Sequence, residues 1–313
     1  MKNKKEIQYV QKVKEHITQA LPPEQLGGLY HGISYPHICK ELRFNFIDGQ
    51  PPTRCDLKGE LCNNRPLPYH QYACHLNSSQ ALCISFFKKF FEKASYESLL
   101  LSILRTAGLS IPENICIVNA CFEYEPSPKE RTNFDFYLEL SDGRHVSFEI
   151  KYTETEFGSI RPCPQDKEKY GHKWRECYLP LTQTCTYFKE SSICSHHFQC
   201  VQFGKFNLTC PEYQNCFIFE FYSHYQISRN IVFAKNPEDI VVFLTPRENH
   251  PLDHERQYID LFAKKHNTIN ILNLYWEDLL ERTLSATQSY PKLFDYFQQL
   301  KEKYFLYNDH IEH

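Results

Sequence analysis

The sequence has no long apolar run, and none of its hydrophobic stretches approaches the roughly 20 residues that a helix needs to cross a bilayer. The N-terminal segment is charged and amphipathic, without the apolar centre of a secretory signal. We therefore expect a cytoplasmic protein that makes no membrane contact. Internal repeats and low-complexity segments are absent as well. With 42% hydrophobic and 23% charged residues among 313, the composition predicts a folded chain with a substantial core.

The chain also lacks an excess of basic residues. Its formal net charge is −3, whereas domains that bind nucleic acids are often basic. The composition therefore gives no support of its own to a nucleic-acid partner. An acidic metal site combined with a local basic rim would give the same total charge.

Paired CxxC steps are missing, although the chain has 14 cysteines. Without a secretion signal, a disulfide framework is not expected. Cys55, Cys62 and Cys74 are scattered, and free buried thiols are the favoured interpretation of the cysteines as a group. The alternative is a tetrahedral structural zinc site in the densest stretch. Its candidate ligands are Cys194, His197, Cys200, Cys210 and Cys216.

The strongest pattern in the chain is NFDFYLELSDGRHVSFEIKYTET, residues 133–155. Apolar residues occupy the even-numbered positions on both sides of Ser141-Asp142-Gly143. Period-two alternation interrupted by Asp-Gly predicts a β-hairpin. We expect its even-numbered residues to face the core and its odd-numbered residues to face the other way.

The alternation also predicts the register of the hairpin. A two-residue turn would place Asp135 opposite Ile150, an acid opposite a core residue. A three-residue turn with Gly143 in the left-handed conformation pairs Asp135 with Glu149 and keeps the apolar residues on one face, because a slip of one residue reverses every side chain. We therefore predict the three-residue turn, with Asp135, Glu149 and Lys151 projecting together.

Two carboxylates and a lysine on one sheet face have a chemical meaning. Opposed carboxylates need a cation between them, and oxygen ligands suit Mg²⁺ or Mn²⁺. Such a metal lowers the pKa of a bound water and stabilises charge on a phosphodiester, and a nearby lysine can position or help to deprotonate that water. The alternative is a solvated strand face with a cross-strand pair between a lysine and an acid.

Asp135, thirteen further residues and then Glu149-Ile150-Lys151 resemble the PD-(D/E)XK nuclease signature, with Phe134 where many members have proline. Three flanking stretches make the resemblance more specific: residues 77–83, residues 152–158 and residues 225–231. Together they are similar to a bacterial restriction-endonuclease-like branch of that superfamily. The resemblance extends from about residue 75 to residue 249.

The resemblance implies an α/β fold, a restriction-endonuclease-like αβββαβ core with a mixed sheet flanked by helices. It implies a magnesium-dependent deoxyribonuclease acting on double-stranded DNA, a 5′-phosphate product and a homodimer that cuts both strands. Asp135 and Glu149 would hold Mg²⁺ together with the carbonyl group of Ile150, and Lys151 would orient the attacking water. Further candidates for the site are Glu97, Gln183, Arg229 and Asn230.

Periodicity predicts the remaining elements. The predicted helices are residues 3–20, 80–91, 96–108, 178–190, 216–233, 252–266, 276–284 and 291–306. The predicted strands are residues 115–122, the two strands of the hairpin, residues 239–245 and residues 269–274. We expect residues 1–74 to form a helix and an irregular segment packed on the core, the part between residues 27 and 68 being irregular. A nuclease domain follows over residues 75–313, with a cysteine-rich insertion around residues 185–216 and helical additions at the C-terminus.

Other functions fit the same core, because a fold does not determine a function. The enzyme could act in DNA repair, on RNA or as a toxin. The non-enzymatic alternatives are a nucleic-acid-binding module without turnover and a zinc-stabilised interaction protein. The presence of both acids argues against the binding module, since two carboxylates would face a polyanion.

Overall fold

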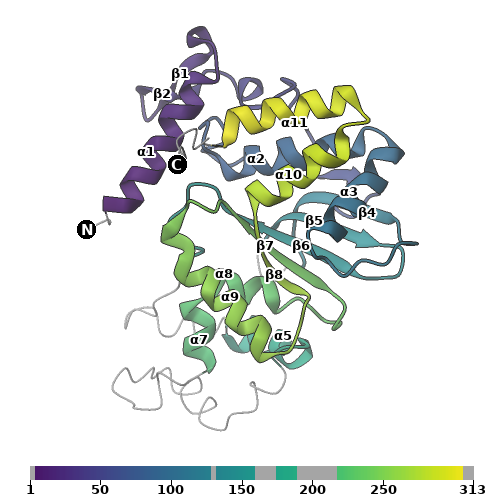
Figure 1. The fold of residues 1–313 in the computed structure, drawn as a ribbon. Helices are drawn as coiled ribbons and strands as arrows, with labels where there is room; N and C mark the ends of the chain where they lie inside the picture. The colour runs from purple at the N-terminus through teal and green to yellow at the C-terminus, as the bar shows by residue number, and fades with distance from the viewer. Residues whose placement is uncertain (1–3, 128–131, 159–173, 189–216, 306–313) are drawn as a thin grey trace, which may run out of the picture.

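The computed structural model describes residues 4–127, 132–158, 174–188 and 217–305. In these residues a six-stranded sheet runs through the molecule in the spatial order β3-β4-β5-β6-β7-β8 (Figure 1). Strands β3 to β6 pair in antiparallel fashion, and β6, β7 and β8 pair in parallel. The six strands are β3 (Asp56–Lys58), β4 (Ile117–Tyr124), β5 (Phe134–Leu140), β6 (His145–Ile150), β7 (Ile240–Thr245) and β8 (Ile271–Tyr275).

Helices cover both faces of this sheet (Figure 1). One face packs against α2, α3, α10 and α11, and the other packs against α5, α8 and α9. The predicted fold class, an α/β protein with a mixed sheet between helices, is confirmed. The α-helices of the described residues are α1 (Lys4–Gln19), α2 (Ser79–Lys88), α3 (Ala94–Thr106), α5 (Leu179–Thr184), α7 (Phe217–Ser223), α8 (Tyr225–Ile231), α9 (Asp253–Lys265), α10 (Trp276–Thr287) and α11 (Pro291–Tyr304).

The sequence of β7, IVVFLT, explains why helices lie on both sides. All six of its residues are buried. Val242 and Leu244 belong to one hydrophobic cluster, whereas Val241 and Phe243 belong to the other. Successive side chains of a strand point to opposite faces, so an unbroken apolar run requires a cover on each face. None of the helices in the described residues is both long and apolar enough to cross a bilayer.

The hairpin of β5 and β6 has the predicted three-residue turn. Leu140 N–H donates to the carbonyl of Arg144 over 2.9 Å, and Phe136 pairs with Phe148. Gly143 has φ of +84°, a conformation that other residues adopt at a cost. In this register the positions of Asp135 and Glu149 lie opposite each other on neighbouring strands.

The prediction that the even-numbered residues of the hairpin face the main core is wrong at one residue. Phe134 packs with Tyr137 and Phe233 in a third hydrophobic cluster and not in the main core. The pattern changes opposite Glu123, which lies between the partners of Phe134 and Phe136 and has φ of +52°. A left-handed residue in a strand disturbs the alternation of the pairs beside it.

The prediction that residues 27–68 are irregular is also wrong. They contain most of β1 (Leu26–Tyr30), all of β2 (Ile33–Cys39), which form a separate two-stranded sheet, and β3, which extends the main sheet by one strand. The sequence shows no period here because β3 is only three residues long. Strands β1 and β2 have several exposed residues and therefore no clear apolar face.

Two predicted helices are shorter than expected. The helix predicted for residues 178–190 ends at Thr184, because Cys185 has extended backbone with ψ of 133°. The helix predicted for residues 216–233 is divided into α7 and α8 at His224, whose φ and ψ are −116° and 46°. The His224 ring stacks on Tyr258 of α9 with 3.5 Å between ring centroids. This contact on a neighbouring helix is invisible to local periodicity.

Burial of Lys303 predicts a pH-dependent stability. Its ammonium donates to the carbonyl of Asn45 over 2.7 Å, and burial lowers the pKa of Lys303 from 10.5 to about 7. Between these pH values the unfolded chain binds one more proton than the folded protein, so the free energy of unfolding rises with pH. The slope approaches roughly 1.4 kcal/mol per pH unit. Below pH 7 the lysine is protonated in both states, and its contribution to the slope disappears.

Urea unfolding of the wild type and of Lys303→Met between pH 6 and about pH 9.5 checks this expectation. The wild type should gain stability relative to the variant above pH 7, whereas exposed Lys292→Met should follow the wild type. The neighbouring thiols Cys39 and Cys74, whose pKa values their mutual hydrogen bond and burial also shift, are present in both proteins, so their titration cancels in the difference between the wild type and Lys303→Met. Parallel curves for the wild type and Lys303→Met would contradict the assignment.

Candidate active site

A polar cavity of about 470 Å³ opens where β6 ends. Asp135 of β5, Glu149 and Ile150 of β6 and Lys151 line it. Strand β6 pairs with β7 in parallel, and ligands of open α/β sheets bind outside the carboxyl ends of parallel strands. Other parts of the wall are formed by residues 77–80, at the start of α2, and by Gln226 of α8.

Asp135 is held in the cavity by the backbone of the neighbouring strand. Its Oδ2 accepts a hydrogen bond of 2.6 Å from Ile150 N–H. Burial, followed by repulsion from Glu149 and Glu123, raises the pKa of Asp135 well above its usual value. The carboxylate is therefore in an environment that disfavours its negative charge, and a cation would relieve the repulsion.

Glu149 is almost completely buried, with 2% of its surface exposed. Its Oε1 lies 2.7 Å from Lys151 Nζ, and its Oε2 accepts a hydrogen bond of 2.6 Å from Asn230 Nδ2. Asn230 comes from α8, far away in the sequence, and is itself buried. These two contacts fix the orientation of the carboxylate inside the sheet.

Lys151 follows β6 directly, and its N–H donates to the carbonyl of Leu244 in β7. Burial lowers the pKa of Lys151, but attraction by Glu149, Glu154 and Asp135 outweighs this effect, and the net shift is upward. The side chain is therefore an ammonium ion at neutral pH. It can orient a phosphate or a water molecule.

The sequence did not identify two further acids beside the cavity. Glu123 of β4 is 3% exposed and accepts hydrogen bonds from Gln80 Nε2 over 2.6 Å and from Asn133. Glu154 accepts from the Ser79 hydroxyl over 2.6 Å. The left-handed backbone of Glu123 gives no signal in the sequence, whereas Glu154 and Gln80 lie within the stretches that carry the resemblance.

The start of α2 is tied to the segment that follows β6. Ser78 caps the helix by accepting from Ala81 N–H, as its residue type predicts. Asn77 Nδ2 donates to the Thr153 hydroxyl over 2.8 Å. The wall of the cavity is therefore held in position by side chains that the sequence places at a helix N-terminus.

The other predicted site residues are distributed differently. Glu97 forms an ion pair with Lys58 of β3 and does not line the cavity. Gln183 is exposed on α5, and the guanidinium carbon of Arg229 lies 5.3 Å from the centre of the Tyr225 ring. Asn230 does join the site, through Glu149. The candidate zinc ligands Cys194, His197, Cys200, Cys210 and Cys216 lie outside the described residues.

Comparison with protein families gave a match that covers most of the chain. A model described as "Restriction Endonuclease associating with ARP" covers residues 23–305, which include every residue of the cavity wall except Val10. No curated protein and no solved structure matches the chain.

Removal of the Asp135 charge should stabilise the protein when no divalent cation is present. Asp135→Asn keeps an oxygen that can accept from Ile150 N–H, but it removes the repulsion by Glu149 and Glu123. We expect a higher Tm in the presence of a chelator, by about 2–4 °C for each kcal/mol of repulsion removed. Calorimetry measures the change, and the exposed Asp295→Asn is the control. A lower Tm for Asp135→Asn would show that the charge is satisfied without a cation.

Proposed function

The chain belongs to the family of restriction endonucleases associating with ARP, and on that premise we propose that it hydrolyses phosphodiester bonds of DNA with Mg²⁺ at the cavity of Asp135, Glu149 and Lys151. We assign it to the PD-(D/E)XK superfamily. The observation that carries the proposal is the meeting of a buried carboxylate, a half-buried carboxylate opposite it and one ammonium ion at the carboxyl end of β6. The product would be a 5′-phosphate and a 3′-hydroxyl.

The donor set fits a hard divalent cation. In the described part of the chain one oxygen of Asp135 accepts from Ile150 N–H, and the second has no hydrogen-bond partner. Burial and the negative charges of Glu149 and Glu123 raise the pKa of Asp135. The same negative charges would attract a cation. Asp135, Glu149 and the carbonyl oxygen of Ile150 are the oxygen ligands that Mg²⁺ or Mn²⁺ prefers.

Mg²⁺ held by these ligands would lower the pKa of a bound water and stabilise the charge that develops on the phosphate. The chain supplies positioning. Asn230 donates a hydrogen bond to Glu149 and holds it in one orientation, as hydrogen bonds to metal ligands generally do. Lys151, as an ammonium ion, holds the attacking water or a phosphate oxygen near the acids.

Cleavage assays with supercoiled plasmid and phage DNA in Mg²⁺ or Mn²⁺ test the assignment. Asp135→Ala and Lys151→Ala should each lower the rate by about 100-fold or more, because each removes a group that contacts the reacting atoms. The matched controls are Asp295→Ala and Lys292→Ala, which change the same residue types at exposed positions of α11. The controls should cleave like the wild type.

Discrete fragments that disappear in both site variants would establish a site-specific endonuclease. Cleavage that survives both substitutions would place the chemistry elsewhere. A wild type that binds metal without cutting DNA or RNA would favour a binding module. Analytical ultracentrifugation of the same samples tests whether the enzyme is a homodimer.

Asn230 offers a graded test of the same proposal. Asn230→Ala removes the hydrogen bond to Glu149 Oε2 but leaves both acids in place. Losses of about 10- to 100-fold in metal affinity or activity are typical for such a contact. We expect the Mg²⁺ concentration for half-maximal cleavage to rise, with partial recovery of the rate at high Mg²⁺. An unchanged Mg²⁺ dependence would separate Asn230 from the metal site.

A further inference from the structure

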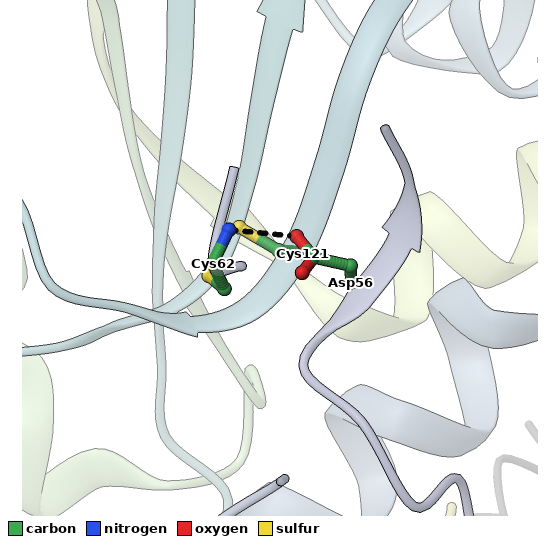
Figure 2. Close-up of side chains that lie close together, drawn as sticks. All are labelled: Asp56, Cys62 and Cys121. Atoms are coloured by element: carbon green, nitrogen blue, oxygen red, sulfur yellow. Dashed lines mark hydrogen bonds between the residues drawn. The ribbon is translucent and has the colours of Figure 1, made fainter. Parts of the chain in front are cut away.

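A second group of metal-binding side chains lies at the other edge of the sheet. Asp56 of β3 and Cys121 of β4 are paired across neighbouring strands, and Cys62 comes from the loop after β3 (Figure 2). Carboxylate oxygen and thiol sulfur atoms of the three residues lie within 4.8 Å of one another. The proposed nuclease chemistry uses none of these residues.

The backbone of the loop brings Cys62 to this position. Asp56 Oδ1 accepts from Cys62 N–H over 2.9 Å, the dashed line in Figure 2, and its Oδ2 accepts from Asn64 N–H over 2.7 Å. Arg65 N–H donates to the carbonyl of Cys62 over 2.9 Å. The loop is therefore folded back on β3, and the Cys62 side chain faces that of Cys121.

The surroundings fit a structural metal ion. Cys121 is completely buried and packs with Phe134 and Tyr137, which excludes competing ligands on that side. Cys62 and Asp56 are partly exposed, so a metal ion and one water molecule can reach the group. Arg65 interacts electrostatically with the neighbouring Cys55, with Glu125 and with Cys62, so part of its positive charge lies beside the sulfur atoms.

We propose that Cys62, Cys121 and Asp56 bind a Zn²⁺ ion that fastens β3 and its loop to the edge of the main sheet. Thiolate and carboxylate ligands suit Zn²⁺, and water fills the fourth position. Tetrahedral Zn–S bonds of about 2.3 Å place two sulfur ligands about 3.8 Å apart, so the observed spacing requires only side-chain rotation of the thiols. The two thiolates, the carboxylate and Zn²⁺ carry one net negative charge, close to the Arg65 guanidinium, which also pairs with Glu125.

A metal ion at this site would stabilise the attachment of β3 to the sheet. Strand β3 has three residues and two paired positions with β4, too few to hold an edge strand firmly. A zinc ion that joins the strand, its loop and β4 supplies binding free energy to the folded state alone. The site would thus complete the sheet at the edge farthest from β8.

Metal analysis of the full chain, purified under reducing conditions, loaded with ZnCl₂ and desalted, tests the proposal. Residues 194–216 contain further cysteines, so the difference between the wild type and each variant is the quantity that decides. Cys62→Ser and Cys121→Ser should each hold one zinc fewer per chain than the wild type. Cys62→His, which restores a ligand, should hold the same number as the wild type, and so should the control Cys116→Ser, whose cysteine is exposed.

Titration with Co²⁺ gives an independent readout, because thiolate-to-cobalt absorption reports sulfur ligands directly. It should weaken in Cys62→Ser and Cys121→Ser and stay unchanged in Cys116→Ser. Circular dichroism identifies a variant that fails to fold, in which case Cys62→Ser, in a loop, carries the test in place of Cys121→Ser. Equal zinc content in the wild type and Cys62→Ser would overturn the proposal, and so would a wild type that holds no zinc.

Discussion

The repulsion between Asp135 and Glu149 is the constraint on which the arrangement around the cavity depends. Two carboxylates on adjacent strands at the end of a buried strand oppose folding unless other groups hold them there. Lys151 and Asn230 satisfy Glu149, and a backbone N–H satisfies one oxygen of Asp135. The acids therefore stay close together, at a cost that the large apolar core on both faces of the sheet must offset.

Strand β6 connects the two halves of the sheet. It pairs in antiparallel fashion with β5 and in parallel with β7, so the cavity forms where the hairpin meets the parallel part. The hairpin brings Asp135 opposite Glu149, while the parallel side brings Leu244 to the backbone of Lys151 and α8 to Glu149. The antiparallel half and the parallel half of the sheet thus contribute different groups to the cavity and its supports.

The sequence predicted correctly that Asp135, Glu149 and Lys151 lie together, because the determinants of this arrangement are local. Asp135, Glu149 and Lys151 lie within one hairpin, and alternation together with Gly143 was enough to predict the register. Glu123 could not be found in the same way, since its position depends on a left-handed backbone and on Gln80 and Asn133. Strand β3 was missed for a related reason, because its pairing with β4 joins positions some 60 residues apart in the sequence. The division of the predicted long helix at His224 depends on Tyr258 of another helix.

Tyr152, the residue after Lys151, connects the end of β6 to both ends of the described chain. Its carbonyl accepts from the hydroxyl of Tyr9 in α1, and its own hydroxyl donates to the carbonyl of Tyr304 at the end of α11. A ribosome that has just made the hairpin has not yet made α8 or α11. Asn230, which orients Glu149, and Tyr304, which anchors the Tyr152 hydroxyl, thus emerge after the hairpin, and a nascent chain carries the two acids before it has these supports. The order of synthesis leaves the Glu149 carboxylate without its hydrogen bond from Asn230 until α8 has been made.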